Sequence, residues 1–399
     1  MLTSVPHATR RTVGWLGIHR GHPARPFERW VERAIFLTSF AAIGLVFLIF
    51  LFIAREALPL FLGQVNSAAL KPVIASADLE KTAPAVLQKY LGMTAKEYAS
   101  KEVETLRTLL EIREEADKEF PESFRQDPDA RVNTTAWSYL FAPHAWSGYS
   151  QADYIWQPVG TISKYNLVPL LVGSLKVTLI GLGFAIPFAL GAALYVSQLA
   201  PAKSKEWLKP GVELLSGIPS VVLGAFTLLV VAPELQRMCG YTSRSPLNAL
   251  VAGLALGLTA IPLIFSLAED ALTSVPRSYT QAALALGASR WQTAWQIVLP
   301  AAAPGVFAAM VLGFGRCIGE TMVVLIVSGN AATTSWSLLD SARTITATIA
   351  AEMAEAVNGG HHYRVLFLLG TMLFAVTFVT NLVGDLVMNR LKMRSEGRS

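Results

Sequence analysis

Two ionisable residues lie inside an apolar stretch of the chain, where a charge is costly. Arg316 and Glu320 are four positions apart, near the middle of an apolar run over 302–328. At this spacing two side chains of one helix share a face and can pair. A lone charge at the centre of a bilayer costs at least ~2.5–3.5 kcal/mol, so such residues normally face a bundle interior or a water-filled path. The pattern predicts either a structural pair inside the membrane or a site for a charged ligand.

The residue types favour an anion as the ligand. The guanidinium of Arg316 offers a fixed fork of donors that suits a tetrahedral oxyanion. When it is ionised, Glu320 can accept hydrogen bonds but cannot donate them. It would therefore accept from hydrogen phosphate and repel sulfate, which has no proton to donate. Thr321 is the third candidate residue of this path. Lys176, Asn330 and Arg343 are weaker candidates, because Lys176 could snorkel to the interface and the other two could lie in solvated loops.

A second stretch, 274–300, lies between apolar runs yet is typical of an aqueous, helical, surface-docking segment. Gly287 removes a side chain where a helix must bend or another backbone must come close. Trp291 and Trp295, four apart, are expected on one helical face as an aromatic anchor. Pro300 marks the return to apolar sequence. The alternative is an ordinary interfacial helical hairpin.

The spacing in this stretch resembles the "EAA" loop of ABC-importer permeases, a cytoplasmic coupling helix that inserts into a separate ATPase. The matching residues are Gln281, Ala282, Ala283, Gly287, Ile297, Leu299 and Pro300. Gln281 departs from the Glu that is usual in the family, which weakens any argument for an ion pair there. The resemblance implies that Gln281–Pro300, with Trp291, couples to an ATPase.

The segment Gly-Arg-Cys-Ile-Gly-Glu-Thr-Met, residues 315–322, is similar to Gly-Arg-Ala-Ile-Gly-Glu-Thr-Met of phosphate ABC-importer permeases of the PstC type. Further similar stretches begin at Ala192, Gly217, Glu269 and His362, so that the resemblance covers roughly 167–390. It implies a PstA-type second permease, two ATP-binding subunits, a periplasmic phosphate-binding protein, and a place in the bacterial cytoplasmic (inner) membrane. It implies no cofactor.

Composition excludes several function classes. The chain is 53% hydrophobic and 15% charged, against about 25% charged residues in soluble domains, which indicates a polytopic membrane protein. No basic patch is long enough to track a nucleic acid. Two cysteines exclude a disulfide framework. The chain contains no phosphate loop for ATP, no nucleophile–base constellation, and no metal motif beyond the weak pair His361–His362.

The elements that position these residues are expected to be all-helical: six transmembrane helices of the ABC type I importer fold plus a long extracytoplasmic insertion. We expect a basic tail (1–33), a first span (34–53), an insertion (54–165) with an amphipathic helix over 94–119, a permease core (166–388) and a basic tail (389–399). The later spans are predicted at 167–198, 212–231, 247–267, 302–328 and 363–388, with the coupling loop at 268–301. Basic residues in the tails and in the 201–210 loop place both termini in the cytoplasm.

Three rival functions follow from other interpretations of the same residues. The first is an ABC permease for another oxyanion or small solute. The second is a secondary transporter or channel driven by an ion gradient, which would need no coupling helix and no ATPase. The third is a membrane-anchored signalling protein whose sensor is the 54–165 insertion.

Overall fold

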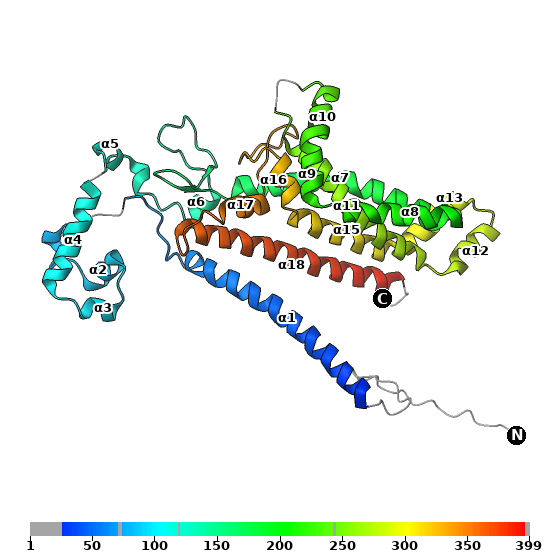
Figure 1. Ribbon diagram of the computed structural model, residues 1–399, viewed down its shortest axis with the longest axis horizontal. Coiled ribbons are helices and arrows are strands. Elements are labelled where there is room, and N and C mark those ends of the chain that lie inside the picture. The colour runs from blue at the N-terminus through cyan, green and yellow to red at the C-terminus, as the bar shows by residue number, and fades with distance from the viewer. Residues whose placement is uncertain (1–25, 71–73, 119, 242–244, 396–399) are drawn as a thin grey trace. The chain divides into compact units, whose positions relative to one another are not determined.

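The computed structural model describes residues 26–70, 74–118, 120–241 and 245–395, and it is mostly helical (Figure 1). The chain divides into two compact units, Met1–Phe52 and Ile53–Ser399. Most of the predicted N-terminal tail and the last residues of the C-terminal tail lie outside the described residues. Helix α1 (Pro26–Phe61) contains the whole predicted first span. Its 36 residues reach about 54 Å at 1.5 Å each, which exceeds the roughly 30 Å of bilayer hydrocarbon.

The 54–165 segment folds into short helices. These are η1 (Ser76–Asp78), α2 (Pro84–Leu91), α3 (Ala95–Ala99), α4 (Val103–Lys118), α5 (Glu122–Arg125), η2 (Pro128–Arg131) and α6 (Trp137–Phe141). Leu79, Leu87, Leu106 and Leu110 form a small core of their own. The prediction of a single amphipathic helix over 94–119 is wrong, because two helices, α3 and α4, occupy this stretch. Ser100 ends α3, because its hydroxyl donates to the carbonyl of Glu97 at 2.8 Å, and α4 starts afresh at Val103.

The end of this segment packs onto the helical core of the second unit. Strands β1 (Trp156–Gln157) and β2 (Lys164–Tyr165) pair antiparallel, with Trp156 opposite Tyr165. Both aromatic side chains are buried in one apolar cluster with residues of the last helix, including Val365 and Leu369. The segment is therefore joined to the core by apolar burial, the main favourable term in folding.

The helical core contains the remaining elements. They are α7 (Val168–Leu194), η3 (Tyr195–Leu199), α8 (Ala202–Leu214), η4 (Leu215–Gly217), α9 (Ser220–Phe226), η5 (Thr227–Val231), α10 (Ala232–Cys239), α11 (Ala249–Thr273), α12 (Arg277–Ala285), α13 (Arg290–Thr293), η6 (Ala294–Val298), α14 (Leu299–Ala301), α15 (Ala303–Gly319), α16 (Met322–Val327), α17 (Ile345–Glu352) and α18 (His361–Ser395).

Among the described residues, five helical segments are long and apolar enough to cross a bilayer. They are Trp30–Phe61, Val168–Leu199, Ser220–Cys239, Ala249–Thr273 and His361–Arg390. A sixth is formed if Arg290–Ala301 and Ala303–Gly319, bent by 73°, count as one span. This confirms the polytopic helical fold. The interval predicted for the third span, 212–231, is wrong: the helix starts after Pro219 and continues to Cys239, because the chain breaks at Leu215–Gly217.

Helices α7 and α11 meet almost backbone to backbone. A Cβ added at Gly257 would lie 2.7 Å from the carbonyl oxygen of Gly181, closer than real Cβ contacts allow. A Cβ at Gly181 would lie 3.1 Å from the carbonyl oxygen of Gly253. Small residues allow this close approach between helices in lipid, where dispersion contacts replace the hydrophobic effect as the driving force. The resulting helix pair supports α15, which carries the candidate site.

Candidate functional site

The fifth span is broken at the candidate site. Helix α15 ends at Gly319, and Glu320 adopts an extended conformation with φ −69° and ψ 132°. The chain resumes a helical path at Thr321, before α16. The expected uninterrupted helix over 302–328 is therefore wrong, and Arg316 and Glu320 do not share one helical face as predicted. In the described structure no ion pair joins the two side chains.

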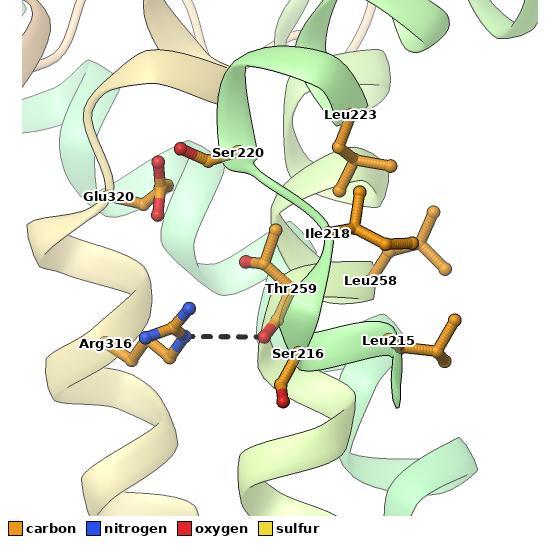
Figure 2. Close-up of a pocket in the computed structure, with 9 residues that line it drawn as sticks. All are labelled: Leu215, Ser216, Ile218, Ser220, Leu223, Leu258, Thr259, Arg316 and Glu320. Atoms are coloured by element: carbon orange, nitrogen blue, oxygen red, sulfur yellow. Dashed lines mark hydrogen bonds between the residues drawn. The ribbon is translucent and has the colours of Figure 1, made fainter. Parts of the chain in front are cut away.

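Within the described part of the chain, the side chain of Arg316 makes one weak hydrogen bond. Its Nε donates to the carbonyl oxygen of Thr259 on α11 at 3.4 Å, near the limit for a hydrogen bond (Figure 2). The residue is in the last turn of α15, where the negative end of the helix dipole favours a cation. Its side chain is exposed. The guanidinium therefore retains donors that a ligand could use.

Arg316 and Glu320 line a pocket of about 180 Å³ between α15, α11 and the start of α9. The other lining residues are Leu215, Ser216, Ile218, Ser220, Leu223, Leu258 and Thr259. In Figure 2, Glu320 extends toward Ser220 and Arg316 toward Thr259, so the two charges project from one side of the pocket onto hydroxyl-bearing residues. The pocket is smaller than the roughly 300–1,000 Å³ of drug-sized ligand sites, so it suits a small ion.

At the break, two threonine hydroxyl groups donate hydrogen bonds to backbone carbonyl oxygens. Thr321 Oγ1 donates to the carbonyl oxygen of Gly319 at 3.3 Å. Thr346 Oγ1, on α17, donates to the carbonyl oxygen of Glu320 at 2.9 Å. Irregular backbone at membrane depth needs such partners, because lipid offers none. Thr321 is not among the pocket-lining residues, so the structure gives its side chain a bond at the break and no contact with the pocket.

The three weaker candidates have structural partners outside this pocket. Lys176 is 3% exposed, and its Nζ donates to the carbonyl oxygens of Ser335 at 2.8 Å and Ser337 at 3.2 Å. Asn330 has a positive φ of 52°, and its Nδ2 donates to the carbonyl oxygen of Leu325 at 2.6 Å.

Arg343, the third of these candidates, forms an ion pair with Glu352, the last residue of α17. Its Nε also donates to Thr348 Oγ1 at 3.1 Å. Burial raises the pKa of Glu352, while Trp156 Nε1, which donates at 3.1 Å, and Arg343 act in the opposite direction. Arg343 therefore belongs to a polar cluster apart from the pocket.

The 274–300 stretch has the surface features expected of an anchor. Trp291 and Trp295 stack with ring centroids 6.0 Å apart and an interplanar angle of 16°, and they are 57% and 55% exposed. Gln281 and Ala282 are exposed, whereas Ala283 is buried. Ile297 and Pro300 are also exposed, and Leu299 is half-buried.

A turn divides this stretch. Gly287 adopts a φ of +87°, a left-handed conformation that favours glycine, between α12 and α13. Of the two roles expected for Gly287, the structure shows the turn and no close backbone, since an added Cβ would meet nothing within 4 Å. The stretch is not one helix: α12 lies before the turn, and α13, η6 and α14 follow it as one continuous helical run. Ser289 and Gln292 form a capping box that starts this run.

Sequence reasoning missed part of the pocket. Ser216, Ser220 and Thr259 were not candidates, and neither was Thr346. Pro219 was the available signal, since a proline inside an apolar run ends or kinks a helix and so marks a boundary there. No signal near Glu320 points to Thr346, which is 26 residues away in the chain. No cluster of three or more His, Cys, Asp or Glu side chains that could hold a metal occurs in the described part of the chain.

Comparisons with known proteins identify the family. The family model "Binding-protein-dependent transport system inner membrane component" matches residues 185–395. The chain is 34% identical over 252 residues to the probable ABC transporter permease protein YqgH of Bacillus subtilis (strain 168), which covers 62% of this chain and 81% of that protein. It is 35% identical over 260 residues to the phosphate transport system permease protein PstC of Xylella fastidiosa (strain Temecula1), covering 61% and 78%.

A solved bacterial ABC transporter involved in the import of the acidic polysaccharide alginate is also similar, with 17% identity and a TM-score of 0.44 over 56% of this chain and 79% of that one. The family model spans over half of this chain, and the relatives named above exceed 30% identity over about four fifths of their length. The chain therefore belongs to the family of binding-protein-dependent transport system inner membrane components, the permease subunits of ABC importers.

Proposed function

We propose that this chain is a permease subunit of an ATP-driven importer of inorganic phosphate. The observation that carries the proposal is the pocket at the break of the fifth span, where Arg316 and Glu320 face three hydroxyl-bearing residues. Several relatives named as phosphate transport system permease proteins support the same substrate.

The pocket chemistry suits hydrogen phosphate. Arg316 would neutralise the anion through its free donors, and the hydroxyl of Ser220 can donate to a further oxygen. The hydroxyl of Ser216 already donates to the carbonyl oxygen of Glu213 at 2.6 Å, so it can offer the ion only an acceptor. Glu320, when ionised, can only accept, so it would bind the proton that hydrogen phosphate carries. Sulfate has no such proton, so the carboxylate of Glu320 would repel it. The same pair would therefore attract the ion and discriminate between oxyanions.

A second permease subunit is expected to cover this face. Residues 213–219 are all exposed, and the backbone at Leu215–Pro219 is not α-helical. Exposed irregular backbone beside an exposed Arg316 is incompatible with lipid, because unpaired backbone groups and charges are both costly there. We infer that a PstA-type partner packs against this face and that the ion passes between the two subunits. Thr321 would act on this path indirectly, through its hydrogen bond to the carbonyl of Gly319 at the break, since its side chain does not line the pocket.

Energy would enter from other subunits. Trp291 and Trp295 present an exposed aromatic surface on the 274–300 stretch, suited to a cleft in one of two ATP-binding subunits. A periplasmic phosphate-binding protein would deliver the ion from the other side. In this proposal the 54–165 segment lies outside the cytoplasm, both termini lie inside it, and the complex is in the bacterial cytoplasmic membrane.

The test is phosphate uptake by the complex reconstituted in vesicles, comparing wild type with Arg316→Gln and Glu320→Gln. We expect Arg316→Gln to reduce uptake at least tenfold, the scale at which a lost charge-assisted contact acts. Glu320→Gln should reduce the preference for phosphate over sulfate. Uptake that is unchanged in both variants would contradict the proposal. Uptake that needs an ion gradient and no ATP would favour a secondary transporter.

A further inference from the structure

The break at Glu320 depends on a donor from a distant element. The amide of Glu320 still donates to the carbonyl of Cys317 at 3.2 Å, as in the last turn of a helix. Its own carbonyl lies beyond the helix and receives Thr346 Oγ1 at 2.9 Å. Thr346 is 7% exposed, so water does not readily replace it. A partly buried carbonyl that loses its donor is unfavourable, so the hydroxyl of Thr346 favours the bent conformation over a continued helix.

The helix that carries Thr346 is fixed at its N-terminal end. Thr344 caps α17, since its side chain accepts from the amide of Ala347 at 3.3 Å. The amide of Ile345 donates to Ser174 Oγ on α7 at 2.9 Å. Gly173 lets the backbone of Arg343 approach α7 so closely that a Cβ there would lie 3.0 Å from the Arg343 carbonyl carbon. The start of α17 therefore has little freedom to shift.

Its C-terminal end is fixed by the polar cluster already described. Glu352 pairs with Arg343 and accepts from Trp156 Nε1 of β1 at 3.1 Å. His362 Nε2 lies 3.4 Å from the other carboxylate oxygen of Glu352. Arg343 precedes α17 in the chain, His362 follows it, and Trp156 belongs to the end of the 54–165 segment. Helix α17 is thus held at both ends, with Thr346 aimed at the break.

We propose that Thr346 is a positioning residue for Glu320. Its hydrogen bond fixes the backbone of Glu320, and this sets where the carboxylate enters the pocket. The inference rests on the proposed function, since it assumes that Glu320 contacts the transported ion. Thr346 itself does not line the pocket and need not touch the ion.

The test is a double-mutant cycle on phosphate uptake by the reconstituted complex. Thr346→Val keeps the shape of the side chain and removes the hydroxyl, and Thr346→Ser keeps the hydroxyl. We expect Thr346→Val to lower kcat/KM roughly tenfold per assembled complex, the scale on which a buried acceptor loses its donor, and Thr346→Ser to stay within about twofold of wild type. In the Glu320→Gln background, Thr346→Val should cause less than about a twofold further loss, because the group it positions is already altered.

The possible outcomes separate this inference from the proposed function. If Glu320→Gln alone has no effect on uptake or selectivity, the proposed function of the pocket fails. If Glu320→Gln impairs transport but the loss from Thr346→Val multiplies with it, the two residues act independently and only the positioning role is refuted. Equal behaviour of Thr346→Val and Thr346→Ser would also refute it, because the two differ in the hydroxyl.

Discussion

Replacing Gly173 by alanine tests whether the close packing of α7 on the start of α17 supports the site. A Cβ at Gly173 would overlap the carbonyl oxygen of Arg343 and lie 3.0 Å from its carbonyl carbon and 3.1 Å from its nitrogen, against 3.4–4 Å in ordinary contacts. The obstacle is backbone and cannot rotate away. Forcing an extra carbon into a packed interior typically costs about 1–3 kcal/mol.

Gly183→Ala is the matched control on the same helix, since a Cβ there meets nothing within 4 Å. Both variants gain roughly 0.5–1 kcal/mol from replacing glycine inside a helix. The difference between them therefore isolates the overlap, and we expect Gly173→Ala to be less stable than Gly183→Ala by about 1–3 kcal/mol. The midpoint of thermal unfolding of the purified complex, at one fixed scan rate, shows which of the two variants is less stable.

Transport should suffer more than stability in Gly173→Ala. The displaced Arg343 precedes α17, and a shift of about 1 Å at a site can cost as much as 100-fold in rate. We expect uptake per folded complex to fall well below that of Gly183→Ala. If Gly173→Ala unfolds no earlier than Gly183→Ala and transports equally well, the packing of α7 against Arg343 does not control the site, and the reasoning fails.

Three further predictions concern other parts of the second unit. Gly287→Ala places a Cβ on a residue with φ +87°, at a cost of about 1–2 kcal/mol. It should raise the number of ATP molecules hydrolysed per phosphate imported. An unchanged ratio would mean that the turn between α12 and α13 does not couple ATP hydrolysis to transport. Lys176→Met removes the Nζ donor from the carbonyl of Ser335 and one of the donors to the carbonyl of Ser337, which also accepts from the amide of Asp340. It should destabilise the protein by roughly 1–3 kcal/mol while the KM for phosphate stays constant; a changed KM with unchanged stability would indicate that Lys176 contacts the transported ion. Burial raises the pKa of Glu352 from its usual 4.5, so the folded protein holds this proton more tightly than the unfolded chain. Its contribution to stability is complete below 4.5 and is lost as the pH rises through the raised pKa. Wild type should therefore lose thermal stability relative to Glu352→Gln as the pH rises above 4.5, and parallel profiles would contradict this.

The crossing helices were predictable because their signal is local. Long apolar runs have few alternatives in a bilayer, and glycine and proline mark where the runs end. The second span was expected at 167–198 and is found at Val168–Leu199. Gly287 was predicted to accompany a bend, because a residue without a side chain is the one that tolerates a left-handed turn.

The details of the site could not be predicted because they depend on tertiary contacts. Nothing in the sequence from Gly315 to Thr321 distinguishes a helix that continues from one that stops at Gly319. The stop is stabilised by Thr346, whose hydroxyl arrives from another helix. The expected pairing of Arg316 with Glu320 assumed helical spacing, and the extended conformation of Glu320 removes that spacing. For the same reason the pocket-lining Ser216 and Thr259 were missed, since separate elements bring them together.

The close approach of α7 and α11 has a consequence for how the subunit can move. Two helices whose main chains touch at Gly181 and Gly257 cannot slide past one another without steric collision, so they should travel as one rigid body. Any alternation between inward- and outward-open forms must then be absorbed elsewhere, at residues whose torsion angles can change. The 3₁₀ turn at Leu215–Gly217 and the extended residue Glu320 interrupt the α-helices beside the pocket, and they are the natural hinges for such a motion.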